Sequence, residues 1–338
     1  MELAAFFNNA EVTVVTSPRG FPALEHNKLV SENIIFDPSG ANLSAIRKLS
    51  GNLKRRGYSL SINVSEKIWA YMIPFLAGIK MRIGFSPGYT QPVKALIVRG
   101  LLTHEVKYLN IPSKAIGSHE VERQLRLLEP LGIRTKGSPL SVALRSEDLE
   151  WARHFLKEHS FNGAGRKSAD NDSKAVIALH LSQKWLLEGW DMYMLSLFIT
   201  SLLSMMKNVI LIATYSDAEM PWAKSLLDEI ADTRLIACHG ETFGKWASIL
   251  TSTDLLITMD TSASHLASAL QLPVIDIFHE RYYVHCTERW HPWRVPYRLV
   301  EKRSIAAEAA GSQKRKAVED MVKEVIHQIR DMMKWENI

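Results

Sequence analysis

The stretch 255–270 constrains the fold of this chain more than any other. It begins with an apolar run of strand length, continues with small polar residues, and ends with apolar residues at helical spacing. This pattern predicts a buried strand, a tight turn and a helix capped by Thr261 or Ser262, whose hydroxyl oxygen can accept free amide groups of the first turn. A helix that starts at the carboxyl end of a parallel strand favours anions. We therefore expect a phosphate at this turn, assisted by His265, although this histidine could instead only pack or cap.

Strand-like and helix-like segments alternate along the chain, which predicts α/β layers with parallel sheets. The expected strands are 12–16, 33–36, 60–64, 81–85, 175–179, 208–213, 234–237, 255–259 and 273–278. The expected helices are 43–56, 65–77, 118–131, 190–206, 218–231, 243–251 and 313–334. Residues 86–115 combine Pro, Gly and mixed polarity, and we expect a long loop there.

The chain is long enough for two domains, and its small, polar segment 163–174 is the expected linker. We expect an N-terminal domain over 1–162 and a second domain over 175–311. A packed C-terminal helix is expected over 312–338, because its apolar residues form one stripe.

Composition and charge indicate the cellular compartment and the kind of binding partner. No apolar run reaches the roughly 18 residues of a membrane span, and the start does not read as a signal peptide. Cys238 and Cys286 lack CxxC partners, which favours a reducing, cytoplasmic setting without structural zinc. Residues 1–150 hold 19 Lys and Arg against 13 Asp and Glu, and the remainder holds 22 against 23. This asymmetry indicates either an anionic partner for the first half or a mixed, solvated surface; no nucleic-acid motif is present.

The string Asp-Thr-Ser-Ala-Ser-His-Leu-Ala-Ser-Ala-Leu-Gln-Leu-Pro-Val at 260–274 resembles the C-terminal signature of glycosyltransferase family 9, the lipopolysaccharide heptosyltransferases and their relatives. Residues 118–133 and 82–84 also resemble family segments. Two departures are Ser262, where the family often has Gly, and the sequence of 183–186, which lacks the Pro of a Lys/Arg-x-Trp-Pro motif and is shifted by one. The resemblance implies a GT-B fold, in which two Rossmann-like domains face a central cleft.

The resemblance further implies an inverting glycosyltransferase that needs neither a metal nor a cofactor. The donor would be a nucleotide-sugar, ADP-heptose above others. The acceptor would be an anionic, lipid-linked glycan of the lipopolysaccharide core, met at the cytoplasmic face of the inner membrane with peripheral membrane contact. A non-catalytic nucleotide-sugar-binding protein and a GT-B sugar epimerase are the alternatives.

Donor binding would fall to residues that can meet a diphosphate, whose negative charge grows as the glycosidic bond breaks. The implied donor-binding residues are Thr261, Ser262, Ala263, His265, Lys184 and Asp217. Asp217 would accept from the ribose hydroxyls, and Asp260 would orient the turn. In the plainer interpretation, Lys184 is only solvated and Asp217 is a helix N-cap.

Family members open with a strand, a Gly-Asp loop and a helix, and the loop Asp is the expected general base. Residues 6–10 resemble the inside of that helix. We therefore expect the first strand and the catalytic base to be absent from this chain, and Glu2 and Glu11 lie on the wrong elements to replace the base. The catalytic residue is accordingly left unassigned.

Overall fold

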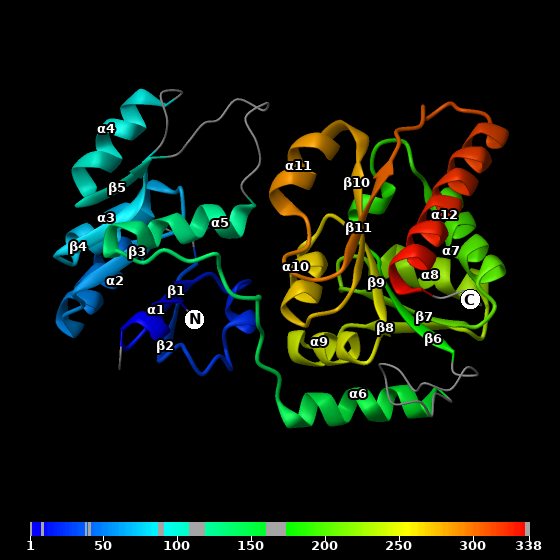
Figure 1. Cartoon of the computed structure of the whole chain (residues 1–338), viewed down its shortest axis with the longest axis horizontal. Helices are drawn as coiled ribbons and strands as arrows, with labels where there is room; N and C mark the ends of the chain where they lie inside the picture. The colour runs from blue at the N-terminus through cyan, green and yellow to red at the C-terminus, as the bar shows by residue number, and fades with distance from the viewer. Residues whose placement is uncertain are drawn as a thin grey trace. The chain divides into compact units, whose positions relative to one another are not determined.

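The computed structural model describes residues 2–7, 10–37, 39, 42–86, 91–107, 119–159 and 174–334. The chain divides into two compact units, unit 1 (Met1–Ser138) and unit 2 (Pro139–Ile338). All strand pairs found in the described residues are parallel, and helices accompany the strands in both units (Figure 1). The predicted α/β class is therefore confirmed.

Unit 2 contains a sheet of six strands in the order β11-β10-β9-β6-β7-β8. The strands are β6 (Ala175–His180), β7 (Val209–Tyr215), β8 (Leu235–His239), β9 (Leu255–Met259), β10 (Val274–His279) and β11 (Tyr297–Lys302). The helices are α6 (Ser146–Glu158), α7 (Met192–Met205), α8 (Met220–Ile230), α9 (Phe243–Thr251), α10 (Ser262–Ala269), α11 (Tyr283–Trp290) and α12 (Gly311–Met333). The chain runs outward from β6 to β8, returns beside β6 and then runs outward again from β9 to β11. The strand order therefore reverses between β6 and β9, as at the switch point of a doubly wound sheet.

Helices cover both faces of this sheet, because successive side chains of a strand point to opposite faces. Ile177 and Leu179 of β6 belong to a core shared with α7, α8 and α12. Ala178 belongs to a second core with α9 and α10, and Val176 to a third with α6 and α9. Burial on both faces explains why the strands of this unit read as continuous apolar runs.

The strands of unit 1 form two sheets, β1-β2 and β3-β4-β5. Its strands are β1 (Thr13–Thr16), β2 (Glu32–Ile35), β3 (Leu60–Asn63), β4 (Met81–Ser86) and β5 (His104–Lys107). Its helices are α1 (Glu2–Phe6), α2 (Leu43–Arg56), α3 (Ile68–Leu76), α4 (Pro92–Leu101) and α5 (Glu120–Leu125). The Tyr58 hydroxyl, just before β3, donates to Thr13 Oγ1 of β1 at 2.8 Å and links the two sheets.

The expectation of a long loop at 86–115 is wrong, because α4 and β5 lie within this range. Ala95 and Val98 of α4 are buried, while Val93, Leu96 and Ile97 are exposed, so its sequence lacks a clean polar face. The helix expected at 118–131 is shorter than predicted: α5 ends at Leu125, and a 3₁₀ turn (Arg126–Leu131) that contains Pro130 follows. Helices α6 and α11 and strand β11 had no counterpart among the expected elements.

The boundary between the units differs from the one expected from the sequence. Helix α6 belongs to unit 2, since its Ala152 and Leu156 pack in one core with residues of β6 and β7. The division falls between Ser138 and Pro139, and of the expected linker 163–174 only Lys174 is among the described residues. The helix expected at 312–338 is α12, which ends at Met333 and packs into the core of unit 2.

Candidate functional site

Two loops meet at the switch point of the unit 2 sheet. Lys184 lies on a 3₁₀ turn (Gln183–Leu186) that follows β6, and Asp260 directly follows β9. Lys184 Nζ is 2.9 Å from Asp260 Oδ2 and also donates to the Asp260 carbonyl oxygen. Both side chains remain partly exposed, at 46% and 27%. Ligands of doubly wound sheets bind in the crevice at such a point, so this pair marks the candidate site.

The turn after Asp260 starts α10 and is fixed by Thr261. Thr261 Oγ1 accepts from the Ala263 amide at 3.2 Å and lies 3.1 Å from Thr258 Oγ1. The single hydroxyl proton of Thr258 goes to the Met259 carbonyl at 2.8 Å, so Thr261 is the donor of the pair. The structure thus gives Thr261 the cap role. Ser262 is exposed, and its hydroxyl has no partner among the described residues, so it is the better placed to meet a ligand.

His265 lies one turn into α10, with its ring 5.9 Å from that of Trp290 in an edge-to-face arrangement. Burial lowers its pKa, against the raising effect of the Asp260 carboxylate. The imidazole is therefore neutral near pH 7 and offers one N–H donor rather than a positive charge.

A buried carboxyl group supports the turn from β10. Asp276 is fully buried, and the Ser264 hydroxyl donates to its Oδ2 at 2.5 Å, while Oδ1 has no partner among the described residues. Burial raises the pKa of Asp276 well above its usual value, which favours the neutral acid. Sequence reasoning missed this residue, although a single acid within an apolar strand was a usable signal.

A buried lysine supports the loop that carries Lys184. Lys302 of β11 is fully buried and donates to the carbonyl oxygens of Leu187 at 2.7 Å and of Lys184 at 3.3 Å. Its ammonium also lies 5.3 Å from the ring centre of Trp190, and burial lowers its pKa to about 8. No sequence pattern indicates this role, because lysines in strands are normally solvated.

Asp217 follows β7, and the side chain it contacts is neither Lys184 nor Asp260. Its Oδ1 is 3.1 Å from His239 Nε2 at the end of β8, and its side chain is 89% exposed. The His239 ring stacks on Tyr215 at 4.9 Å. The structure therefore brings Lys184, Asp260 and the start of α10 together, and it places Asp217 with a different pair of residues.

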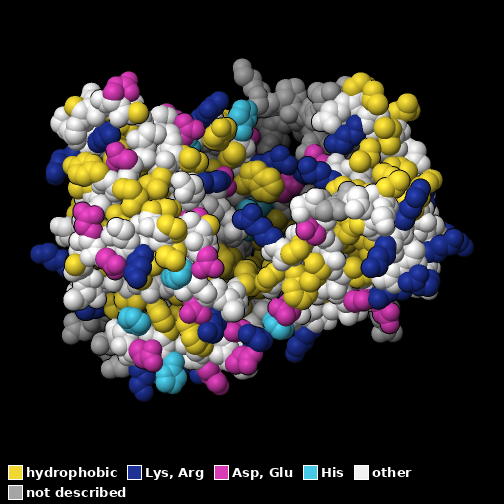
Figure 2. All heavy atoms as spheres, turned by 180° about the vertical axis from the view of Figure 1, so that it is seen from behind, with side chains coloured by type: hydrophobic (Ala, Val, Ile, Leu, Met, Phe, Trp, Pro, Cys, Tyr) yellow, Lys and Arg dark blue, Asp and Glu magenta, His cyan; other side chains and the backbone are white. Residues whose placement is uncertain are grey.

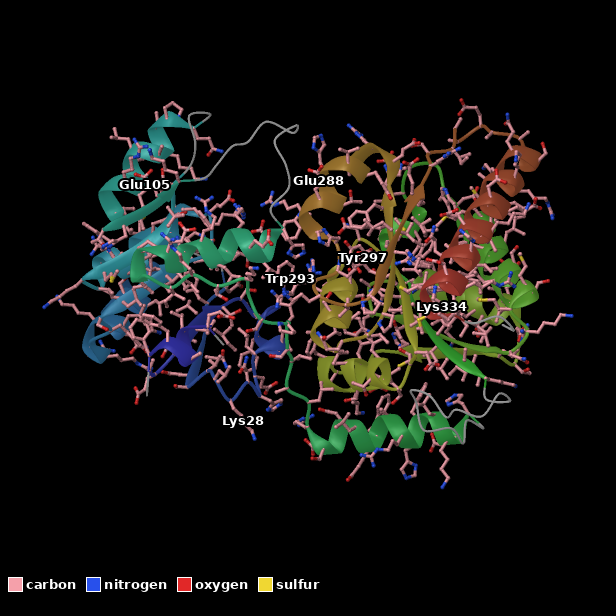
Figure 3. The ribbon with its side chains drawn as sticks, in the orientation of Figure 1. Lys28, Glu105, Glu288, Trp293, Tyr297 and Lys334 are labelled. Atoms are coloured by element: carbon pink, nitrogen blue, oxygen red, sulfur yellow. The ribbon has the colours of Figure 1, made fainter. Side chains whose placement is uncertain are left out.

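Two contacts fix the far end of α10 and the segment after α11. The Trp293 amide, labelled in Figure 3, donates to Ser268 Oγ at 2.9 Å. The rings of His291 and Tyr297 stack at 5.2 Å. Within the described ranges, no group of three His, Cys, Asp or Glu side chains is placed to hold a metal ion, and no helix is long and apolar enough to cross a membrane.

Comparison with known proteins agrees with the fold and shows the family. The model of glycosyltransferase family 9 (heptosyltransferase) matches residues 46–319. Lipopolysaccharide heptosyltransferase 3 of Escherichia coli K12 is 22% identical over 296 residues, which cover 85% of this chain and 78% of that protein.

Two solved structures have a similar fold. ADP-heptose lipopolysaccharide heptosyltransferase II of E. coli gives a TM-score of 0.67 at 14% identity, covering 96% of this chain and 93% of that one. E. coli heptosyltransferase WaaC with ADP-2-deoxy-2-fluoro heptose gives 0.62 at 16% identity, covering 96% and 93%. The expected GT-B class is confirmed by this likeness. The chain belongs to glycosyltransferase family 9, the heptosyltransferase family, and is a glycosyltransferase.

Proposed function

We propose that unit 2 binds a nucleotide-sugar, ADP-heptose, at the crevice between the loops that follow β6 and β9. The single observation that carries this proposal is the meeting of Lys184 and Asp260 beside the N-terminus of α10, at the switch point of the sheet. A solved relative of similar fold holds ADP-2-deoxy-2-fluoro heptose, which supports both the nucleotide and the sugar.

Each group of the cluster has a chemical role in this proposal. The diphosphate leaving group gains negative charge in the transition state, and donors fixed at that charge lower the barrier. Lys184 supplies a cation, Ser262 a hydroxyl donor and His265 an N–H donor. Thr261, the Ala263 amide and buried Asp276 keep the turn in shape, and Asp260 holds Lys184 over it. The general base is not assigned to any described residue.

The acceptor in this proposal is an anionic, lipid-linked glycan of the lipopolysaccharide core, bound by unit 1 at the cytoplasmic face of the inner membrane. The excess of Lys and Arg over Asp and Glu in the first 150 residues supports an anionic acceptor, since opposite charge raises its local concentration. Similarity to lipopolysaccharide heptosyltransferase 3 supports the class of glycan.

The test compares ADP, UDP, GDP and ADP-heptose by calorimetry and follows ADP release in the presence of lipopolysaccharide core acceptors. We expect ADP to bind more tightly than UDP or GDP, and we expect ADP-heptose to release ADP only when acceptor is present. Tighter binding of UDP than of ADP would contradict the proposed donor. Binding of ADP-heptose without transfer to any core acceptor would assign the chain to non-catalytic donor binding instead.

A further inference from the structure

Helix α4 of unit 1 exposes one apolar stripe. Val93 is 73% exposed, Leu96 74% and Ile97 46%, and these positions lie on the same side of a helix because their spacings are three and four residues. Ala95 and Val98 point the other way and are buried. The helix thus has an apolar inner side and an apolar outer side, and only the inner side is used by the fold.

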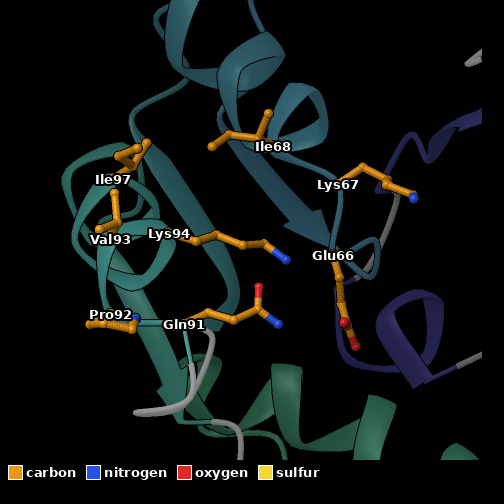
Figure 4. A pocket seen from close by; sticks show the side chains of 8 residues that line it. All are labelled: Glu66, Lys67, Ile68, Gln91, Pro92, Val93, Lys94 and Ile97. Carbon is orange, nitrogen blue, oxygen red and sulfur yellow. The ribbon is translucent and has the colours of Figure 1, made fainter.

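The exposed stripe continues onto α3, which packs beside α4. Ile68 at the start of α3 lines an open pocket together with Val93 and Ile97 (Figure 4). The whole lining consists of Glu66, Lys67, Ile68, Gln91, Pro92, Val93, Lys94 and Ile97. Toward the other end of α3, Phe75 is 43% exposed and lies under the Arg82 guanidinium at 5.3 Å. Arg82 Nε in turn donates to the carbonyl of Leu101 at the end of α4, so the two helices are tied together there.

Positive charges outnumber negative charges around this surface. Residues 60–107 contain six Lys and Arg and only two acids, Glu66 and Glu105. Both acids are paired: Glu105 with Arg99 at 3.1 Å and Glu66 with Arg123 at 3.6 Å. Four lysines have no carboxylate within 4 Å among the described residues, and they are Lys67, Lys80, Lys94 and Lys107. Figure 2 views the protein from behind, so the α4 region of unit 1 is at the upper right there, and hydrophobic side chains lie next to Lys or Arg side chains in that region.

We propose that the α3/α4 surface, defined by Ile68, Phe75, Val93, Leu96 and Ile97 with its surrounding lysines, docks unit 1 on an anionic phospholipid membrane. An interfacial helix inserts exposed aliphatic side chains at the depth of the headgroups, and flanking lysines bind the anionic headgroups. No described helix is suited to cross the bilayer, so this contact is peripheral. The proposal requires neither the donor nor the acceptor proposed above, and it can fail without them.

The residue types favour a membrane over a protein partner or a second copy of this chain. Protein interfaces are depleted of lysine and enriched in aromatic residues and arginine. This surface is mainly aliphatic, with Phe75 as its one exposed aromatic residue among those defining it, and it has lysines at its border. A second copy would also bring the same positive charge against this surface, which opposes self-association.

The test is flotation of the full chain with phosphatidylcholine vesicles prepared with and without phosphatidylglycerol. We expect binding only to the vesicles with phosphatidylglycerol, and we expect high salt to weaken it because screening reduces the attraction of exposed charges. Leu96→Asp should reduce the bound fraction at least about tenfold, because it replaces an inserted apolar side chain by a charge. Lys94→Glu should reduce it by a smaller factor.

Matched controls lie elsewhere in the chain. Val284→Asp changes a valine that is 62% exposed on α11 of unit 2, and Lys48→Glu changes an exposed lysine on α2; both should keep wild-type vesicle binding. Unchanged circular dichroism and an unchanged urea unfolding transition show that Leu96→Asp is folded. Absence of wild-type binding to phosphatidylglycerol vesicles, or equal loss in Val284→Asp, would overturn the proposal. A wild-type dimer in sedimentation that Leu96→Asp dissociates would also overturn it, by assigning the surface to a second copy.

Discussion

The two units use their apolar residues differently. In unit 2, every residue of β7 and of β9 is buried, and one sheet joins all six strands. In unit 1, neither β1 nor β2 contains a fully buried residue, and the strands form two smaller sheets. Of the 19 large hydrophobic residues exposed in the described part of the chain, 13 belong to unit 1. Unit 2 therefore buries most of its large apolar side chains around one sheet, whereas unit 1 leaves more of them exposed to solvent.

This difference matters for the site. The candidate donor residues lie on short loops whose ends are held by buried strands, and two of their supports, Lys302 and Asp276, come from neighbouring strands. Such a frame holds polar groups in place before a ligand arrives, which is what stabilisation of a developing charge requires. Binding of a glycan or a lipid surface does not require polar groups that are fixed in place beforehand.

The largest expected effect is on the free energy of unfolding, and it distinguishes buried from exposed apolar residues. Leu256→Ala removes a fully buried side chain of β9 and should lower the free energy of unfolding by about 3 kcal/mol, through lost burial and the cavity that remains. Leu96→Ala makes the same change at a 74% exposed position and should cost under about 0.5 kcal/mol. Urea unfolding measures both, and equal costs would break the comparison.

A second effect concerns acid sensitivity. His180, at the end of β6, contacts Thr214 Oγ1 at 3.1 Å and the Trp246 ring at 5.2 Å, and burial lowers its pKa to about 4. Between pH 6.5 and 4 the unfolded chain binds the proton more readily, so stability is full above pH 6.5 and falls as the pH is lowered through this window. The free energy of unfolding should fall by about 2 kcal/mol over this window. This is less than the full pKa shift implies, because His180 keeps some exposure to solvent.

Replacement of this histidine tests the assignment. His180→Gln should flatten the pH dependence of stability between pH 4 and 6.5, whereas His26→Gln, at an exposed position of unit 1, should leave it unchanged. An unaltered pH profile in His180→Gln would show that other groups carry the acid sensitivity of unit 2.

The smallest effect is local to unit 1. Asn42 caps α2, and its Oδ1 accepts from the Ala45 amide at 2.9 Å. Asn42→Ala should lower the stability of α2 by about 1 kcal/mol, because one amide of the first turn loses its acceptor. Hydrogen exchange should accelerate in α2 and stay unchanged in β6 and β9. Faster exchange in those strands would mean that the two units do not respond independently.

Local patterns were sufficient where neighbours in the sequence decide the structure. The bounds of α2 and α9 match the predicted helices 43–56 and 243–251, and the turn at 260–262 was recognised from its strand, hydroxyls and helix. Prediction failed for α4, because apolar residues lie on both of its sides and conceal the helical period.

Contacts between distant residues explain what was missed at the site. Lys302 reaches the Leu187 carbonyl across 115 positions of sequence, and Asp276 meets Ser264 only because β10 lies beneath α10. Likewise, α6 joins unit 2 through packing with β6 and β7. The roles of Lys184, Ser262, His265 and Asp217 toward a ligand stay predictions.

The central claim is that donor phosphates bind between Lys184 and the N-terminus of α10, and calorimetric titration with ADP tests it most directly. Lys184→Met removes the cation but keeps an unbranched side chain, and it should weaken ADP binding at least about tenfold, the effect of losing a charge-assisted hydrogen bond. Lys224→Met, at an exposed lysine of α8, is the matched control and should bind ADP like the wild type. Unchanged ADP affinity in Lys184→Met would contradict the claim and place the donor elsewhere on the chain.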